Sequence, residues 1–348
     1  MASSGVKLHF MSDECLDVFC HILPVEYCAA ANRRLTRPSF MFTRAQAIPV
    51  MVNLEARFAV MDQFPGYRQI PSLASPTPEQ IAGPEESPEL ARIANDALAK
   101  LVSTQRDRFP SFVAALPLNN PEAALVEAER AVKQLGAAGV QIMTSMGGRP
   151  LDEPPHLAWF ELAAKLGCAV WLHPTRPMTR PDYPVESVSK FDIWWSLGWP
   201  FETSVAMLRL AFAGLFDRCP DLPVITHHVG GIIPLLEGRL GSGMELLGTR
   251  TPPEHADAVR HQLQEPPLSA LRRFYADTAS FGSRAAIECG RTFFGADRLM
   301  FATDMPFDPD QGPGYIRATL KAIRETSLSE PERKGILAGN AVRVLNLL

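Results

Sequence analysis

The sequence lacks a strong charge of either sign and a long apolar run, and both absences limit what the protein can do. Its 34 Lys and Arg residues nearly balance 38 Asp and Glu residues, which leaves a net charge of −4 at pH 7. This weak acidity argues against a surface for nucleic acid or another polyanion. The apolar runs are too short and too interrupted to span a bilayer, and the first residues lack the apolar core of a signal peptide. We therefore expect a cytoplasmic protein with neither nucleic acid nor membrane as a partner.

Clustered cysteines are also missing. The six cysteines have no paired spacing, which excludes a zinc knuckle and gives no sign of a disulfide framework. They are Cys15, Cys20, Cys28, Cys168, Cys219 and Cys289. We expect them to be reduced and mostly buried thiols.

What the sequence does contain is a regular alternation of strand-like and helix-like segments. The predicted strands cover residues 15–20, 67–74, 112–118, 139–145, 168–174, 222–228, 272–279 and 297–304. The predicted helices cover residues 53–64, 86–109, 119–136, 156–167, 202–220, 231–247, 283–295, 312–326 and 330–347. Continuous apolar strands that alternate with amphipathic helices indicate a parallel sheet covered by helices.

Eight such units favour a closed (β/α)8 TIM barrel, which is an α/β fold, over an open doubly wound sheet. The G-x-G-x-x-G string that a dinucleotide-binding open sheet carries after an early strand is absent. We predict a single barrel domain over residues 15–348, preceded by an N-terminal extension of residues 1–14, with Met11 as an alternative start to Met1. Residues 25–53 are predicted to form a long, lid-like loop inserted after the first strand.

Histidine and aspartate stand at the ends of four predicted strands, which is where a barrel of this kind carries its chemistry. They are His21 in the first strand, His173 in the fifth, His227 and His228 in the sixth and Asp304 in the eighth. One histidine at a strand end is more often structural, so the coincidence of several on one face carries the prediction. Imidazole and carboxylate together suit zinc or another borderline divalent ion. The sequence therefore predicts a metal site.

The strings around these residues resemble the amidohydrolase superfamily. In chain order they are LDVFCHILP (16–24), WLHP (171–174), GWPFET (198–203), HVGGIIP (228–234), FYADTA (274–279) and FATDMP (301–306). The ordered set is similar to the branch of aminocarboxymuconate semialdehyde decarboxylase and runs from about residue 15 to the end. The resemblance implies a (β/α)8 barrel with one divalent metal ion, usually zinc. It also implies a small carboxylated substrate and a homodimer.

The resemblance further assigns roles to residues of this chain. His21, His173 and Asp304 would bind the metal ion, and Asp304 would lie close to the metal-bound water. His228 matches the catalytic histidine of the H-x-G-G motif and would transfer protons together with Asp304. A divalent ion lowers the pKa of bound water and polarises substrate oxygens, which suits both decarboxylation and hydrolysis.

Two arginines are candidate binders of the substrate carboxylate. Arg239 stands at the spacing of an arginine that, in the family's decarboxylases, reaches the substrate of the neighbouring subunit; a surface salt bridge is the alternative. Arg57 is the second candidate, although a packing role is the favoured interpretation for it. In the 25–53 insertion, Arg44 and neighbouring arginines could attract an anionic substrate, unless the segment is simply a solvated loop.

One position departs from the family pattern, because Phe19 stands where H-x-H has its first histidine. Strand alternation places Phe19 and His21 on one face and Cys20 on the other, so Cys20 does not easily replace the missing ligand. Three protein ligands plus water still make a workable zinc site, although with lower expected affinity. The ring of Phe19 would dry one side of the substrate pocket. By the same alternation His227 should face away from His228, so we expect His227 to be structural or to contact the site only through its ligands.

The sequence therefore predicts a metal-dependent, non-oxidative decarboxylase of a small aromatic or unsaturated carboxylic acid, with Zn²⁺ or another divalent ion such as Mn²⁺. A metal-dependent hydrolase or hydratase of a C–C, ester or lactone bond is the first alternative. A metal-free, non-catalytic binding protein is the second, because Phe19 removes a ligand. Against the second alternative stand the polar groups retained at a buried barrel mouth, which cost stability unless they are used.

Overall fold

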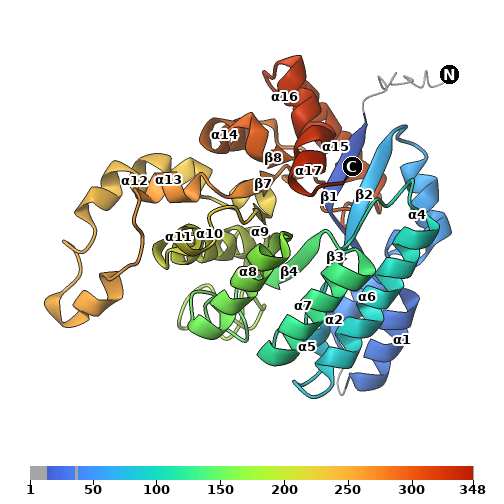
Figure 1. Cartoon of the computed structure of the whole chain (residues 1–348), viewed down its shortest axis with the longest axis horizontal. Coiled ribbons are helices and arrows are strands. Elements are labelled where there is room, and N and C mark those ends of the chain that lie inside the picture. Colours follow the sequence, from blue (N-terminus) through green and yellow to red (C-terminus); the bar gives the residue numbers. More distant parts are fainter. Residues whose placement is uncertain (1–13, 36–37, 348) are drawn as a thin grey trace.

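The computed structural model describes residues 14–35 and 38–347. The predicted N-terminal extension and the alternative start at Met11 therefore lie outside the described residues, apart from Glu14. Eight strands follow one another along the chain with helices between them (Figure 1). The strands are β1 (Cys15–Ile22), β2 (Tyr67–Leu73), β3 (Val113–Ala114), β4 (Gly139–Met143), β5 (Ala169–His173), β6 (Val224–Thr226), β7 (Tyr275–Asp277) and β8 (Leu299–Met300).

The strands form a parallel barrel, as predicted. β1 pairs with β2, and β3 to β8 pair in chain order. Backbone hydrogen bonds bridge both seams between these two sheets. Gln69 N donates to Arg108 O (2.9 Å) just before β3, and Val18 N donates to Phe301 O (3.0 Å) just after β8. The α/β class and the (β/α)8 architecture are therefore confirmed.

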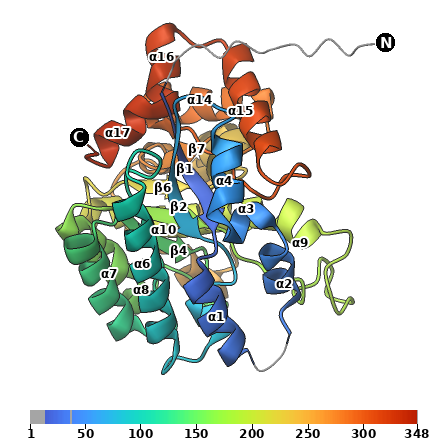
Figure 2. The same cartoon turned by 90° about the vertical axis from the view of Figure 1, so that its right-hand side faces the viewer.

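Helices cover the outside of the strands (Figure 2). The longer ones are α1 (Val25–Arg34), α4 (Leu54–Met61), α6 (Ser87–Thr104), α7 (Pro121–Leu135), α8 (Pro154–Leu166), α10 (Gly198–Phe212), α14 (Arg284–Phe294) and α15 (Pro313–Glu325). The shorter ones are α2 (Phe40–Gln46), α3 (Pro49–Val52), α5 (Pro78–Ile81), α9 (Ile193–Ser196), α11 (Leu215–Arg218), α12 (Glu237–Leu240), α13 (Pro267–Leu271), α16 (Glu330–Lys334) and α17 (Asn340–Val344). Local signals set their ends: Asn120 caps α7 by accepting from Ala123 N (3.1 Å), and Gly136 ends it at φ +78°.

Three predicted helices are interrupted. Residues 202–220 divide into α10, which ends at Phe212, and α11, which begins at Leu215 after Gly214 with φ +72°. Residues 231–247 form 3₁₀ turns and the short helix α12 instead of one helix. Gly231 has φ +66° and Pro234 has no amide proton to donate, so the helix does not run through them. At the C-terminal end, residues 330–347 divide into α16, a π-helical turn and α17.

The segment after β1 is helical, which corrects the prediction of a long loop there. Residues 25–53 contain α1, α2 and α3. Ser39 begins α2 by accepting a hydrogen bond from Phe42 N (3.3 Å). Tyr27 and Phe42 are buried in one apolar cluster of this segment. Because these apolar side chains hold the segment together, α2 has a defined place beside the barrel mouth.

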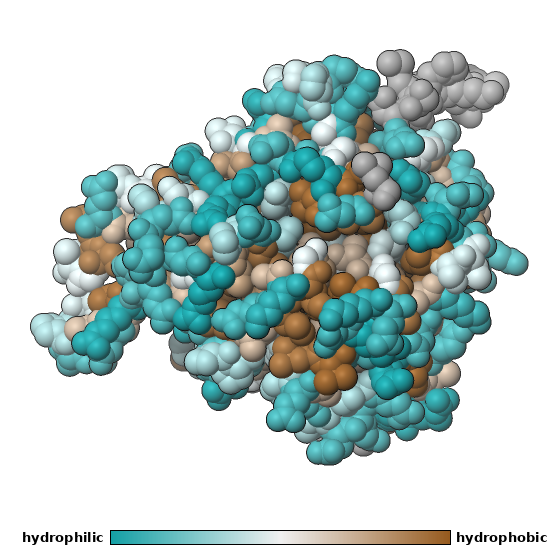
Figure 3. Space-filling model, in the orientation of Figure 1, coloured by the Kyte–Doolittle hydropathy of each residue, from teal (hydrophilic) through white to brown (hydrophobic). Residues whose placement is uncertain are grey.

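The surface is largely hydrophilic on the face shown in Figure 3, with apolar side chains gathered near the centre of the view. In the described part of the chain, we find no helix with the length and apolar character that a membrane span requires. Among the described residues, none of the six cysteines forms a disulfide bond; five are buried and Cys289 is partly exposed. This burial agrees with the expectation of mostly buried side chains.

Candidate metal centre and active site

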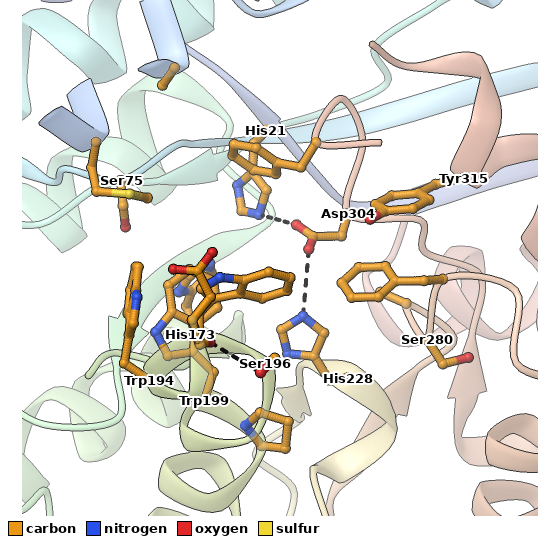
Figure 4. Close-up of a pocket in the computed structure, with 18 of the residues that line it drawn as sticks. His21, Ser75, His173, Trp194, Ser196, Trp199, His228, Ser280, Asp304 and Tyr315 are labelled. Carbon is orange, nitrogen blue, oxygen red and sulfur yellow. Dashed lines mark hydrogen bonds and ion pairs between the residues drawn. The ribbon is translucent and has the colours of Figure 1, made fainter. Parts of the chain in front are cut away.

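A cavity of about 370 Å³ opens at the carboxyl ends of the strands. The predicted metal ligands His21, His173 and Asp304 line it, and so does the predicted proton-transfer residue His228 (Figure 4). Aromatic side chains make up much of the remaining wall: Phe40, Trp194, Trp199, Phe281, Phe307 and Tyr315. The barrel thus brings the polar strand ends together beneath a largely apolar opening.

Three histidine rings converge beside this cavity. His21 at the end of β1, His173 at the end of β5 and His227 directly after β6 each offer a ring nitrogen, and these nitrogens lie within 4.8 Å of one another. The Nε2 atoms of His21 and His227 are buried and make no well-aligned hydrogen bond, and both approach the carboxylate of Asp304. A cation between these nitrogens and the carboxylate satisfies all three buried groups. This donor set fits a divalent metal ion.

The second ring nitrogen of each histidine is fixed by the barrel. The Nδ1 atoms contact Ser72 Oγ for His21 (3.0 Å), Pro174 O for His173 (2.7 Å) and the Asp277 carboxylate for His227. Burial lowers the pKa of His21 and of His173, so both rings are neutral at pH 7, as ligands must be. Burial also lowers the pKa of His227, but the adjacent Asp277 and Asp304 outweigh burial and raise it to about 9.

Asp304 lies at the centre of the site, in the segment after β8. Its Oδ1 lies 3.1 Å from Nε2 of His21 and 3.5 Å from Nε2 of His227, and its Oδ2 lies 3.5 Å from Nε2 of His228. Burial raises the pKa of this carboxyl group, but the three histidines outweigh burial and hold the pKa well below its ordinary value. Asp304 is therefore ionised, which suits both a metal ligand and a proton acceptor.

His227 and His228 both face the site, which corrects the prediction that they point in opposite directions. β6 ends before them, and His228 has φ +56° and is followed by Val229 with φ +58°. This left-handed turn stacks the second imidazole on the first, with ring centroids 3.8 Å apart. Strand alternation holds only for extended backbone, so it gave the wrong orientation here. The one signal for His227 in the sequence is its place beside His228.

Phe19 lies behind the imidazoles and not in the wall of the cavity. Its side chain is fully buried, and its ring stacks on His227 with centroids 3.8 Å apart and an interplanar angle of 15°. The ring centroids of His21 and His173 each lie 5.9 Å from that of Phe19. The predicted contact of Phe19 with substrate is therefore corrected to a packing contact with His227, because the histidines stand between Phe19 and the cavity.

The two predicted carboxylate binders do not line the cavity of their own chain. Arg57 is fully buried, and it donates through Nε to Gln69 Oε1 (2.7 Å) and through Nη1 to His21 O (2.9 Å). Its predicted contact with substrate is corrected to a structural role, since these bonds hold the end of β1. Arg239 is exposed on α12. Its contact with the substrate of a neighbouring subunit stays a prediction.

Arg44 on α2 is the positive charge that does reach the cavity. Among the described residues it is the one Lys or Arg in the cavity wall, and its guanidinium carbon lies 5.9 Å from the ring centroid of Phe307. Tyr315 lines the same cavity, and burial raises the pKa of its hydroxyl to about 12, so the hydroxyl stays protonated. The sequence placed Arg44 only within a group of arginines in the insertion, because the position of α2 depends on tertiary packing.

Comparison with known proteins gives three findings. The sequence pattern of the amidohydrolase family (Amidohydro_2) matches residues 28–347. Gamma-resorcylate decarboxylase from Polaromonas sp. (strain JS666) is 32% identical over 304 residues, 84% of this chain and 87% of that protein. The 2-amino-3-carboxymuconate-6-semialdehyde decarboxylase of Dictyostelium discoideum is 29% identical over 267 residues, 76% of this chain and 69% of that protein.

A solved structure is also similar over nearly the whole chain. It is a dihydroxybenzoic acid decarboxylase from Polaromonas sp. JS666 with bound manganese and the inhibitor 2-nitroresorcinol. It aligns with a TM-score of 0.75 and 26% sequence identity over 96% of this chain and 97% of that one.

Proposed function

Since the chain belongs to the amidohydrolase family and, within it, to a branch of metal-dependent, non-oxidative decarboxylases, we propose that its substrate is a small aromatic acid with a hydroxyl group beside the carboxylate. One observation carries this proposal: candidate metal ligands and a histidine suited to proton transfer meet on one aromatic-lined cavity. The relatives described above are named as decarboxylases of gamma-resorcylate and of an aminocarboxymuconate semialdehyde. An aromatic substrate fits the aromatic cavity wall best.

In this proposal His21, His173 and Asp304 hold a divalent ion. Two imidazoles and a carboxylate suit zinc, and manganese is the alternative because the solved relative holds it. When bound, the ion supplies positive charge that holds and polarises the oxygens of the substrate. The buried Nε2 of His21, which lies 3.1 Å from Oδ1 of Asp304 without a well-aligned hydrogen bond, supports this assignment.

His228 and Asp304 handle the proton. The Nε2 atom of His228 lies 3.5 Å from Oδ2 of the ionised Asp304, and the Nδ1 atom of His228 is buried without a partner. A proton shared between these groups transfers to the ring carbon that bears the carboxylate. The bond between that carbon and the carboxylate carbon then breaks, its electron pair restores the aromatic ring, and CO₂ leaves.

The cavity wall binds and orients the substrate ring. The rings of Trp199 and Phe281 provide flat apolar surfaces on which an aromatic acid stacks. Arg44 in the same wall attracts the carboxylate. The apolar rings also exclude water, which strengthens each charge interaction within the cavity.

The test is the release of CO₂ by the metal-loaded protein from benzoates whose hydroxyl is ortho, meta or para to the carboxylate. We expect the ortho isomer to be turned over at least about 10-fold faster than the meta and para isomers.

His228→Asn should lower kcat by about 10²- to 10⁴-fold at unchanged metal content, because it removes the proton carrier. His255→Asn, at an exposed histidine, is the matched control and should leave kcat unchanged. Hydrolysis of the corresponding esters or lactones without any CO₂ release would contradict the proposal and favour the hydrolase alternative.

We further propose a cytoplasmic homodimer in which Arg239 reaches the cavity of the neighbouring subunit. The exposed position of Arg239 on α12 supports this arrangement. The mass of the protein in light scattering tests it, and a monomer at working concentration would contradict it.

A further inference from the structure

We propose that His227 is itself a ligand of the metal ion and takes the coordination position that Phe19 does not supply from β1. The inference rests on the divalent ion of the proposed function and extends its ligand set. The complete set is then three imidazoles and one carboxylate, from His21, His173, His227 and Asp304. Neither the family resemblance nor strand alternation assigns this role to His227.

The ligand atoms already lie near coordination spacing. The ring nitrogens of His21, His173 and His227 are within 4.8 Å of one another, and Nε2 of His227 lies 3.5 Å from Oδ1 of Asp304. Ligand atoms around a tetrahedral zinc ion with bonds of about 2.1 Å are about 3.4 Å apart. Nε2 of His227 is buried, and the carboxylate of Asp304 is its neighbour. A metal ion that binds there takes the place of the proton on this nitrogen, since a ligating imidazole is neutral.

Asp277 at the end of β7 provides the outer contact typical of a metal-bound histidine. One of its oxygens bonds to Nδ1 of His227, and the other accepts from Val229 N (3.1 Å) and Ala279 N (3.0 Å). Both His227 and Asp277 are fully buried. A carboxylate in this position fixes the ring and leaves Nε2 for the metal ion.

Phe19 gives the ring of His227 its support. The rings of Phe19 and of His228 each stack on His227 with centroids 3.8 Å apart, so they cover opposite faces of its imidazole. His227 therefore has one orientation, with Nε2 directed at the other two histidines. Phe19, which stands on β1 in place of a histidine ligand, thus packs against His227, whose imidazole supplies the missing ligand in this proposal.

X-ray absorption at the zinc edge tests this ligand set, because it counts the imidazoles bound to zinc in the loaded protein. We expect three bound imidazoles per zinc ion in the wild type and two in His227→Ala. The double variant Phe19→His with His227→Ala restores H-x-H, so we expect it to show three bound imidazoles again. His228→Ala should also show three bound imidazoles. This readout does not depend on activity.

Zinc affinity, measured by competition with a chromophoric chelator, is the second readout. His227→Ala should weaken binding at least about 10-fold, and Asp277→Asn by about 10- to 100-fold, since loss of an outer-shell partner has an effect of that size. The double variant should recover most of the affinity. His255→Ala is the matched control at an exposed histidine and should bind zinc as the wild type does.

The outcomes separate this inference from the proposed function. Two imidazoles per zinc in the wild type would overturn the role of His227 and leave a zinc-dependent decarboxylase standing. A loss of one imidazole in His228→Ala, with none lost in His227→Ala, would assign the third ligand to His228 instead. No zinc in the wild type would overturn the metal basis of the proposed function as well. The wild-type count decides even where a variant fails to fold.

Discussion

At the scale of the residue, Asp17 is a fully buried carboxyl group that joins neighbouring strands. It accepts hydrogen bonds from Tyr67 Oη (2.6 Å), from Phe19 N (3.1 Å) and from Thr303 through both Oγ1 (2.5 Å) and N (3.3 Å). These bonds tie β1 to β2 and to the segment after β8, across a seam of the barrel. Burial raises the pKa of Asp17 to about 7, although the hydrogen bonds oppose the rise.

Removal of the Asp17 side chain should destabilise the fold. Asp17→Ala leaves its buried donors without an acceptor, and we expect the free energy of unfolding to fall by about 3–5 kcal/mol.

Asp17→Asn keeps the shape of the side chain but does not titrate, so it isolates the pH dependence that Asp17 causes. Because the pKa rises from 3.8 to about 7 on folding, the stability that protonated Asp17 contributes is lost as the pH rises from about 4 to about 7. Between pH 5 and 7 the free energy of unfolding of the wild type, measured with denaturant, should fall by about 1 kcal/mol per pH unit relative to that of Asp17→Asn. A difference in unfolding free energy that does not change with pH would contradict this prediction.

At the scale of the element, the turn after β6 positions two of the histidines. The backbone is left-handed at His228 and Val229 and again at the two following glycines. The turn also packs closely on α10, because Ile232 N donates to Ser204 Oγ (2.9 Å). A Cβ atom at Gly231 would lie 2.3 Å from Pro200 O. This close contact leaves room only for glycine.

Gly231→Ala should therefore displace the turn and the histidines that it carries. We expect a lower melting temperature, from a loss of about 2 kcal/mol or more, together with loss of decarboxylation. Gly238→Ala on α12 is the matched control, because a Cβ atom there meets nothing within 4 Å. Calorimetry and CO₂ release measure the two effects. An equal response of the two variants would show that the close packing at Gly231 does not matter.

At the scale of the whole molecule, the candidate metal centre joins strands from opposite ends of the chain. His21 lies near the end of β1, His173 is the last residue of β5, and Asp304 lies in the segment after β8. One ion bound to them would connect elements more than 280 residues apart in the chain. The distance along the chain follows from the residue numbers, since 304 − 21 = 283. An ion bound there stabilises the folded barrel and not the unfolded chain.

Removal of the metal ion should lower the stability of the whole barrel in one transition. At a free metal concentration about 100-fold above Kd, the bound ion contributes about 2.7 kcal/mol. We expect a chelator to lower the melting temperature by several degrees, and zinc or manganese to restore it while magnesium does not. Differential scanning calorimetry on the treated and reloaded protein measures this. A melting temperature indifferent to chelation would argue for the metal-free alternative.

Much of the fold and part of the site could be predicted because their signals are local. Apolar runs bounded by Pro and Gly located all eight strands, and caps such as Asn120 located helices. His21, His173 and Asp304 could be grouped because the ends of parallel strands meet at one mouth of a barrel. Arg57 could be given only as a candidate with packing as the favoured role, because a sequence does not say how deeply a side chain is buried.

The sequence by itself determined the barrel, the face that carries the chemistry and the residues at its strand ends, since these follow from periodicity and strand direction. Only the tertiary structure decided that His227 joins the cluster, that Phe19 packs behind it and that Arg44 lines the cavity. The physical reason is that these positions depend on contacts between distant segments. Gly231, which ends the left-handed turn that begins at His228, packs on α10, and the residues of the turn do not by themselves say which helix they meet.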